Sequence, residues 1–246
     1  MKAMILAAGL GSRLRPLTDR VPKPLVQVGG QPLIAYPLAL LRAAGIRDVV
    51  INLHHLGGAL RDALGDGDAY GVSITWSEEA PAILDTGGGI KQAQAWLGGD
   101  RFVVLNSDTI LDLDLADMIR FHAGRGALAT MLLRPDREQR RYGEIEIDAT
   151  ARIRRFLGRP AVVDAPLTAL MFGGVHVFEP QVFDYMEAGR FGINAETYPR
   201  MLADGAALYG YRFDGYWRVL DTHAGLAEGR WEAEHDGAWL SSRHRP

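Results

Sequence analysis

The feature that most constrains the fold is an alternation of short apolar runs with longer stretches of helical periodicity. Strands are expected at residues 3–8, 48–53, 72–76 and 101–106, and helices at residues 32–44, 56–64 and 90–97. This order is typical of a sheet whose parallel strands are covered by helices. The sequence therefore predicts an α/β fold with a Rossmann-like, doubly wound mixed sheet.

The order of elements changes after residue 110. Helices are expected at 115–121, 181–186 and 196–203, strands at 127–133, 170–178 and 207–213, and a hairpin at 143–147 and 153–156. A chain of 246 residues with 48% hydrophobic content can bury one full core. We predict a single domain over residues 1–246, with a nucleotide-binding half at 1–110, a half at 111–226 that completes a second binding site, and a tail at 227–246.

Charge and composition argue against several classes of function. The formal net charge of −3 offers no positive field for a nucleic acid backbone. The chain has no cysteine, which rules out a disulfide framework and a thiolate zinc site. The apolar run within residues 1–11 is too short for a signal peptide or a membrane span. We therefore expect a cytoplasmic protein whose partners are neither nucleic acids nor membranes.

A glycine-rich loop follows the first expected strand, in the segment LAAGLGSRLRPLTDRVPKPL at residues 6–25. Gly9 and Gly11 allow the backbone to turn tightly and to bring N–H groups against phosphate oxygens. Arg13 and Lys23 add positive charge. The loop lacks the third glycine of a dinucleotide fingerprint, and no Gly-Lys-Ser/Thr triplet follows it as in a P-loop. These residues indicate a different loop for binding a polyphosphate.

The same segment resembles the signature of the sugar-1-phosphate nucleotidylyltransferase family. That signature runs Ala-Ala-Gly-x-Gly-x-Arg, Pro-Leu-Thr and Pro-Lys-Pro-Leu, and each part stands here in this order. The resemblance implies a glycosyltransferase-A-like nucleotidyltransferase fold, a nucleoside triphosphate and a sugar 1-phosphate as substrates, and catalytic roles for Arg13 and Lys23 at the phosphates. The alternative for Lys23 is a solvated surface lysine. The resemblance also implies that the loop wraps the nucleotide, through Leu6, Ala7, Ala8, Gly9, Gly11, Ser12 and Arg13.

Asp108 follows the strand expected at 101–106, at a carboxyl end, where open α/β sheets place their ligands. A carboxylate there suits Mg²⁺, which binds through one or two carboxylates and substrate phosphates. Taken alone, such an Asp is often only a helix cap. The run Asn106-Ser107-Asp108 resembles the metal-binding motif of the family. The resemblance implies Mg²⁺ as cofactor, Asp108 as a metal ligand and Asn106 as a nucleotide contact.

A second glycine cluster, DTGGGI at residues 85–90, stands ahead of an expected helix. Consecutive glycines permit close backbone approach, and a helix start offers N–H donors, although a flexible turn is the alternative. In the family the matching element contacts base and ribose, which implies nucleotide-binding roles for Thr86, Gly87 and Gly88. This version resembles the muramic acid 1-phosphate uridylyltransferase branch, which favours UTP. For Asn52 we expect a structural role.

The resemblance also implies where the sugar binds. Many family members carry Glu-Lys-Pro in a loop of the second half, whereas this chain has Gly-Arg-Pro at residues 158–160. The cation is thus kept as Arg159, and the usual carboxylate is missing. The residues expected to bind the sugar are Gly143, Glu144, Arg159 and Gly174.

The second metal ligand departs from the common family pattern. Most members carry Trp-x-Asp-apolar-Gly-Thr, whereas residues 217–222 read WRVLDT. Val219 therefore stands where the Asp is expected, and Asp221 comes two residues later. A similar arrangement in the glucose-1-phosphate cytidylyltransferase branch implies that Asp221 joins Asp108 at the metal. The alternative is that Asp221 caps a helix that begins near Thr222.

Together these residues predict a magnesium-dependent enzyme that transfers a nucleoside monophosphate from a triphosphate, with UTP favoured, to a sugar 1-phosphate and releases pyrophosphate. The attacking phosphate is already anionic, so catalysis requires positioning and charge neutralisation by Mg²⁺, Arg13 and Lys23. Two alternatives stay open: a cytidylyl- or guanylyltransferase for a sugar 1-phosphate or another small phosphate, and a non-catalytic nucleotide-binding regulator. The sequence decides neither the sugar nor whether the protein is a monomer or a homodimer.

Overall fold

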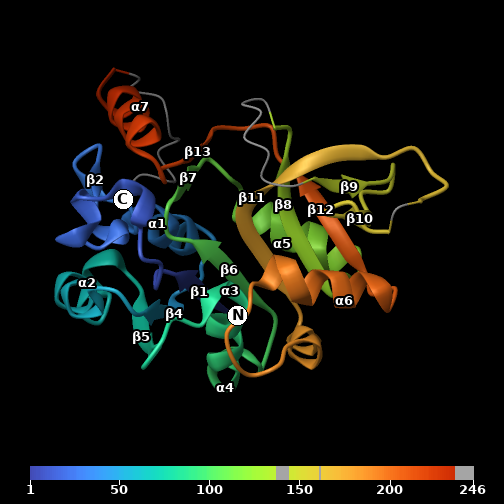
Figure 1. Cartoon of the computed structure of the whole chain (residues 1–246), viewed down its shortest axis with the longest axis horizontal. Helices are drawn as coiled ribbons and strands as arrows, with labels where there is room; N and C mark the ends of the chain where they lie inside the picture. Colours follow the sequence, from blue (N-terminus) through green and yellow to red (C-terminus); the bar gives the residue numbers. More distant parts are fainter. Residues whose placement is uncertain (137–143, 161, 236–246) are drawn as a thin grey trace.

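The computed structural model of the chain describes residues 1–136, 144–160 and 162–235. One large mixed sheet runs through it (Figure 1). Its first half consists of parallel strands in the order β6 (Phe102–Asn106), β1 (Lys2–Leu6), β4 (Asp48–Leu53) and β5 (Ser73–Glu78). The predicted α/β class is confirmed.

The second half of the chain extends the same sheet by antiparallel pairing. β11 (Thr168–Phe178) runs antiparallel to β6, and it also pairs with β8 (Ala129–Arg134) and β9 (Ile145–Ile147). β12 (Leu208–Arg212) pairs with β8, while β10 (Ile153–Phe156) and β9 form the predicted hairpin. The mixed sheet therefore contains strands from both halves of the sequence.

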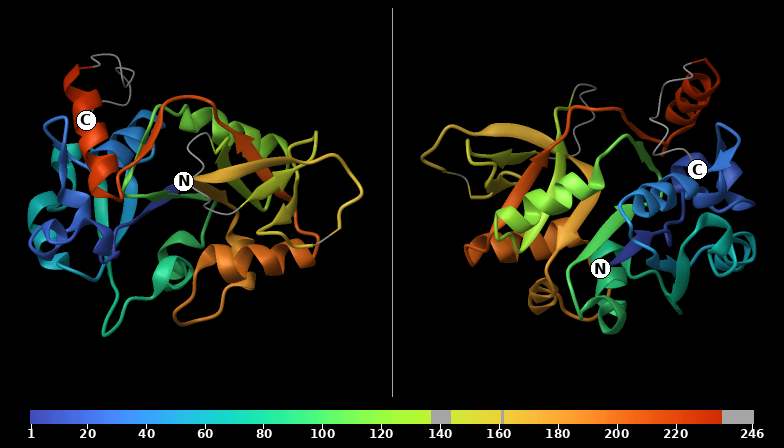
Figure 2. Two further views of the ribbon diagram at one scale, coloured as in Figure 1. Left: turned by 45° about the horizontal axis from the view of Figure 1, so that its top comes forward. Right: turned by 180° about the vertical axis from the view of Figure 1, so that it is seen from behind.

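Helices cover both faces of the sheet, as the views in Figure 2 show. Alternate residues of β1 explain why both faces need cover: Ala3 and Ile5 join one buried cluster, and Met4 joins another. The first cluster includes residues of α1 (Ala35–Ala43), α2 (Gly57–Leu64) and α5 (Leu115–Gly124). The second includes residues of α3 (Asp85–Gln92), α4 (Gln94–Leu97) and α6 (Tyr198–Ala203). No helix within the described ranges has the length and apolarity that a bilayer span requires.

Short elements surround the carboxyl ends of the parallel strands. β7 (Thr109–Leu111) pairs with β13 (Trp217–Val219), and β2 (Gln27–Val28) pairs with β3 (Gln31–Pro32). The last described element, α7 (His223–His235), follows β13 and packs beside β2 (Figure 1). The sequence predicted no element in the tail after residue 226, so most of α7 is a finding of the structure.

The structure corrects several predicted boundaries. The helix predicted at 90–97 begins earlier, at Asp85, and breaks into α3 and α4. It begins early because the carbonyl oxygen of Phe191 accepts two of its first N–H groups and so replaces a side-chain cap. The segment predicted as a helix at 181–186 is a 3₁₀ helix, Pro180–Tyr185, and a π-helical turn, Ile193–Thr197, precedes α6.

Candidate active site

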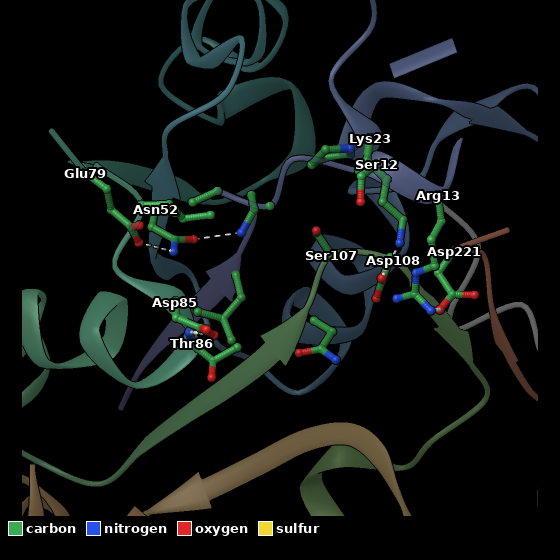
Figure 3. Close-up of a pocket in the computed structure, with 18 of the residues that line it drawn as sticks. Ser12, Arg13, Lys23, Asn52, Glu79, Asp85, Thr86, Ser107, Asp108 and Asp221 are labelled. Carbon is green, nitrogen blue, oxygen red and sulfur yellow. Dashed lines mark hydrogen bonds and ion pairs between the residues drawn. The ribbon is translucent and has the colours of Figure 1, made fainter. Parts of the chain in front are cut away.

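A cavity of about 360 Å³ opens at the carboxyl ends of β1, β4 and β6 (Figure 3). Open α/β sheets bind ligands at this edge. Many of the residues predicted to bind nucleotide or metal line it, namely Leu6, Ala7, Ala8, Gly9, Gly11, Ser12, Arg13, Lys23, Thr86, Asn106, Asp108 and Asp221. Glu79, Ile83 and Arg190 line it as well, and no pattern in the sequence had indicated them.

The glycine-rich loop turns at Gly11, shortly after β1. The φ angle of Gly11 is 61°, in the left-handed region that favours glycine. A Cβ atom there would lie 2.9 Å from Cγ2 of Thr18, whose hydroxyl donates a 2.8 Å hydrogen bond to the carbonyl oxygen of Gly11. At Gly9 a Cβ atom would meet nothing within 4 Å. Gly11 is therefore required by the turn itself, whereas Gly9 leaves open space beside the backbone.

Lys23 and Asp108 form an ion pair within the cavity, between Nζ and Oδ2. Their side chains are 13% and 23% exposed. Lys23 stands between Pro22 and Pro24 and begins a 3₁₀ turn, and Asp108 lies two residues after the end of β6. Largely buried charges are screened less by salt than charges in solvent. Lys23 is thus not a solvated surface lysine.

Arg13 and Asp221 form a second ion pair, with 2.7 Å between an Nη atom and Oδ2. The Asp221 side chain is 3% exposed, whereas Arg13 is 62% exposed. A buried carboxylate needs a compensating charge, and Arg13 supplies one here. The contact joins the glycine-rich loop to the segment that follows β13. Two of the carboxylates that line the cavity, those of Asp108 and Asp221, are therefore each paired with a cation from the glycine-rich segment (Figure 3).

The pairing of β13 with β7 explains how Asp221 reaches this cavity. Val219 pairs with Thr109 and is buried in the core, so a core residue occupies the position at which most family members carry an Asp. The hydroxyl of Thr222 accepts a 3.1 Å hydrogen bond from the N–H of Gly225, as a helix N-cap does. Thr222, rather than Asp221, makes this capping contact, which leaves the carboxylate of Asp221 on the cavity wall.

The chemistry of Asp108 and Asp221 fits a hard divalent cation. Mg²⁺ prefers carboxylate oxygens and usually takes its remaining ligands from water and substrate phosphates. Over the residues that the structure describes, no group of three or more His, Cys, Asp or Glu side chains is placed to hold a metal. Asp108 and Asp221 therefore suit a metal that takes its remaining ligands from water and from the phosphate of a bound substrate.

A buried hydrogen-bond chain involving Glu79 lies in another part of the cavity (Figure 3). Glu79 is 2% exposed, and its carboxylate accepts from Nδ2 of Asn52 and from the N–H of Leu84, each at 2.7 Å. Oδ1 of Asn52 accepts in turn from the N–H of Ala7 at 2.7 Å. The chain ties the loop after β5 to the start of the glycine-rich loop. The local sequence does not distinguish Glu79 from its exposed neighbour Glu78, so only packing identifies it.

The glycine cluster at the start of α3 packs against a second loop of the protein. The N–H groups of Gly87 and Gly88 donate to the carbonyl oxygen of Phe191 at 2.9 Å and 3.2 Å. The hydroxyl of Thr86 accepts from the N–H of Ile193 at 3.0 Å. A Cβ atom at Gly87 would lie 2.1 Å from the ring of Phe191. The N–H groups of Gly87 and Gly88 are thus engaged within the protein, and Asp85 and Thr86 are the residues of the cluster that line the cavity.

The described residues that are expected to bind the sugar do not all lie close to the cavity. Gly174 lies close to the cavity, since a Cβ atom there would be 3.6 Å from Nδ2 of Asn106. Glu144 and Arg159 are exposed residues at and near the hairpin of β9 and β10, and neither belongs to the cavity lining. Gly143 lies outside the described residues.

Sequence comparison relates the chain to known enzymes. The profile of the Nucleotidyl transferase family matches residues 2–234. The N-acetylmuramate alpha-1-phosphate uridylyltransferase of Neisseria meningitidis serogroup B is 37% identical over 241 residues, which cover 97% of this chain and 100% of that protein. The UTP–glucose-1-phosphate uridylyltransferase of Synechocystis is 34% identical over 230 residues, and the alignment covers 88% of this chain and 59% of that protein. The chain thus spans less than two thirds of the Synechocystis relative.

Solved structures share the fold. A Bacillus anthracis protein, assigned as a glucose-1-phosphate thymidylyltransferase and solved in complex with sucrose, superposes with a TM-score of 0.81 at 24% identity, over 99% of this chain and 98% of that one. HddC from Yersinia pseudotuberculosis superposes with a TM-score of 0.78 at 19% identity, over 94% of this chain and 98% of that one. The predicted glycosyltransferase-A-like fold is thereby confirmed.

Proposed function

Because the chain belongs to the Nucleotidyl transferase family, we propose that it transfers a nucleoside monophosphate from a nucleoside triphosphate to a sugar 1-phosphate and releases pyrophosphate. The observation that carries the proposal is the pair of carboxylates, Asp108 and Asp221, each beside a cation in one cavity under a glycine-rich loop. Relatives named as sugar-1-phosphate uridylyl- and guanylyltransferases support it.

The chemistry proposed for this cavity needs no general base. A phosphate oxygen of the sugar 1-phosphate attacks the α-phosphorus of the triphosphate, the bond from that phosphorus to the bridging oxygen breaks, and pyrophosphate leaves with the electron pair. The attacking oxygen is already anionic, so the barrier comes largely from bringing two polyanions together. Lys23 and Arg13 reduce that repulsion by placing positive charge at the phosphates. When bound by Asp108 and Asp221, Mg²⁺ would supply further neutralisation of phosphate charge.

UTP is the proposed nucleotide. The Neisseria relative that aligns over its whole length is named as a uridylyltransferase, and the cluster at Thr86 resembles that branch. A guanylyltransferase is the second candidate, because the mannose-1-phosphate guanylyltransferase of Mycobacterium tuberculosis is 34% identical over 230 residues, 92% of this chain and 63% of that protein. A cytidylyltransferase is the third, since the WRVLDT segment resembles that branch.

The sugar subsite is proposed to use the second half of the chain, with Gly143, Glu144, Arg159 and Gly174 as its residues. The position of Gly174 beside Asn106 supports its inclusion. We further propose that the enzyme is cytoplasmic, and a monomer or a homodimer.

A pyrophosphate-release assay tests the proposal. Purified protein is given each of the four nucleoside triphosphates with a panel of sugar 1-phosphates, in the presence of Mg²⁺ and again with excess chelator. We expect release that requires both substrates and is abolished by the chelator. A protein that binds UTP in calorimetry but releases no pyrophosphate with any pair would instead be the non-catalytic regulator.

A further inference from the structure

α7 contacts both chain segments that supply the Arg13–Asp221 ion pair. The helix begins two residues after Asp221, and its residues also contact the glycine-rich segment that carries Arg13. The chemistry proposed for the cavity uses no residue of α7. The helix nevertheless has three separate sets of contacts: to β13, to a buried apolar cluster, and to the backbone of the glycine-rich segment.

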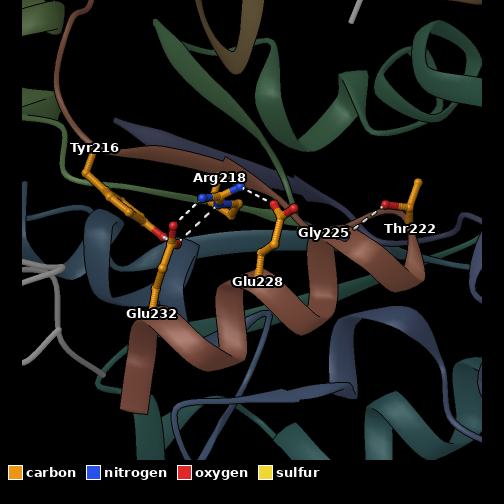
Figure 4. A network of polar contacts seen from close by, with 6 residues as sticks. All are labelled: Tyr216, Arg218, Thr222, Gly225, Glu228 and Glu232. Carbon is orange, nitrogen blue, oxygen red and sulfur yellow. Dashed lines mark hydrogen bonds and ion pairs between the residues drawn. The ribbon is translucent and has the colours of Figure 1, made fainter. Parts of the chain in front are cut away.

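A polar network fastens α7 to β13 (Figure 4). Arg218 of β13 bridges two carboxylates of the helix, with an Nη atom 2.7 Å from Glu228 and the other Nη atom in contact with Glu232. Nε of Arg218 donates to Glu232 at 3.2 Å, and the hydroxyl of Tyr216 donates to the same carboxylate at 2.6 Å. The Arg218 side chain is 17% exposed. Because a planar guanidinium donates in several fixed directions, the network holds the orientation of β13 as well as its distance from α7.

A buried apolar cluster connects the helix to both members of the ion pair. Leu226 of α7, Leu220 and Leu14 belong to this cluster, and each is at most 3% exposed. Leu220 directly precedes Asp221, and Leu14 directly follows Arg13. Close-packed interiors transmit displacements, because side chains there have little room to move independently. A shift of α7 is therefore passed to both ends of the ion pair.

Two polar contacts tie α7 to backbone carbonyl groups of the glycine-rich segment and of β2, which follows it. Nε2 of His223 lies 2.9 Å from the carbonyl oxygen of Arg15, and Nε of Arg230 donates a 3.0 Å hydrogen bond to the carbonyl oxygen of Gln27. These contacts join residues that are about 200 positions apart in the sequence. They hold the helix beside β2, as Figure 1 shows.

We propose that α7 acts as a clamp that holds Asp221 and Arg13 in one geometry, with Arg218 and Glu232 as its positioning residues. This inference rests on the proposed function, because it concerns the carboxylate proposed for the metal and the arginine proposed for the phosphates. Asp221 lies two residues beyond the end of β13, so the position of that strand against α7 sets where the carboxylate points. Releasing Arg218 from its two carboxylates loosens Asp221 without altering any side chain that lines the cavity.

Arg218→Ala tests the clamp, and Arg200→Ala is its matched control. Arg200 also bridges two carboxylates, Glu187 and Glu196, but in the exposed surroundings of α6. In the full chain, hydrogen exchange measured by mass spectrometry should rise at residues 11–15 and 217–222 for Arg218→Ala only. The Mg²⁺ concentration for half-maximal pyrophosphate release should rise about tenfold, as when a group that orients a metal ligand is removed. Arg200→Ala should leave both quantities unchanged.

Glu232→Gln is a milder second variant, and it decides the matter if Arg218→Ala does not fold. It should raise exchange in the same two segments by a smaller amount, and Arg218→Lys should fall between Arg218→Ala and the unmodified protein. Exchange at residues 11–15 that stays at the unmodified level in every folded variant overturns the clamp. If the unmodified protein releases no pyrophosphate from any substrate pair, the proposed function fails, and the exchange measurement still decides the clamp.

Discussion

The backbone N–H of Leu220 donates a 2.9 Å hydrogen bond to the backbone carbonyl oxygen of Asp108. This bond continues the antiparallel pairing of β13 with β7, in which Val219 faces Thr109. Leu220 thereby lies opposite Asp108, and Asp221 is the next residue along the chain. The carboxylates of Asp108 and Asp221 line the same cavity. The position of the second carboxylate is therefore set by strand pairing and not by its distance from Trp217 along the chain.

Asp221→Asn should raise the Mg²⁺ concentration needed for half-maximal activity by about tenfold or more and should lower turnover, because an amide keeps the shape of the side chain but loses the charge that a hard cation needs. Pyrophosphate release titrated with Mg²⁺ measures this. Asp214→Asn is the control, since Asp214 is half exposed and pairs with Arg212 outside the cavity. A lower melting temperature with an unchanged Mg²⁺ dependence would contradict a metal role for Asp221.

Lys23→Ala and Arg13→Ala should each reduce turnover by about 100-fold or more, because each removes positive charge directed at the reacting phosphates. Steady-state kinetics at saturating substrate measures the loss, and circular dichroism establishes that each variant is folded. Arg20→Ala is the matched control, since Arg20 is an exposed arginine of the same segment that does not line the cavity. Near-native rates in both cavity variants would refute the assignment of the loop.

UTP should give the highest kcat/KM of the four nucleoside triphosphates when the sugar 1-phosphate is held constant. The expectation follows from the cluster at Thr86 and from the full-length similarity to the Neisseria uridylyltransferase. The assay is the pyrophosphate release described above, run at several concentrations of each triphosphate. A clear preference for GTP or CTP would replace the uridylyltransferase with one of the two other candidates.

Gly88→Ala should destabilise the protein by about 1–3 kcal/mol, the range typical of overpacking. The new Cβ atom would lie 2.1 Å from the carbonyl oxygen of Gly189, and a backbone atom cannot rotate away as a side chain does. Gly58→Ala in α2 is the control, because a Cβ atom there meets nothing within 4 Å. That change should stabilise the helix by roughly 0.5–1 kcal/mol. Urea unfolding of both variants measures the contrast, and equal effects would show that the glycine is not needed for this packing.

Lowering the pH should destabilise the folded state, because His176 is buried in its neutral form. Burial lowers the pKa of His176 from its ordinary 6.5 to about 3, so the unfolded chain binds a proton at this imidazole in a range where the folded chain does not. The contribution of His176 to the free energy of unfolding is therefore fully present above pH 6.5. It is lost as the pH falls towards 3, at about 1.4 kcal/mol per pH unit.

His176→Gln removes this titration and retains a polar partner for the hydroxyl of Tyr198, which lies 2.7 Å from Nδ1 of His176. The free energy of unfolding is measured in urea at pH 4.5, 5.5 and 6.5. In this variant it should fall less steeply as the pH is lowered, and the difference in slope should correspond to about one fewer proton bound on unfolding. His235→Gln changes an exposed histidine and should keep the original slope. An unaltered slope in His176→Gln would contradict the prediction.

The sequence predicted the glycine-rich loop and Asp108 because both depend on local order. Gly11 adopts a backbone conformation that favours glycine, and its neighbours Arg13 and Lys23 lie within the same short segment. Asp108 follows a strand whose apolar run is plain in the sequence. A parallel sheet then brings the ends of such strands to one edge whatever the details of packing.

The burial of Glu79 and the contacts of α7 could not be predicted from the neighbouring residues in the sequence. The burial of Glu79 depends on Asn52 and Leu84, and nothing in the neighbouring residues marks it as different from Glu78. The role proposed for α7 depends on contacts between Arg218 and two carboxylates, Glu228 and Glu232, which lie 10 and 14 residues further along the chain. Such contacts depend on how the elements pack against one another, so no periodic pattern in the sequence predicts them.

The sequence by itself determined the fold class and the turn of the glycine-rich loop, because hydrophobic periodicity and glycine conformations act over a few residues at a time. Only the tertiary structure decided that Val219 enters the core and Asp221 reaches the cavity, since that choice depends on the register of β13 against β7. Residues two apart on a regular strand face the same side, but β13 ends at Val219, so Asp221 does not have to follow Val219 into the core. The pairing partner, which lies more than 100 residues away in the chain, selects the register.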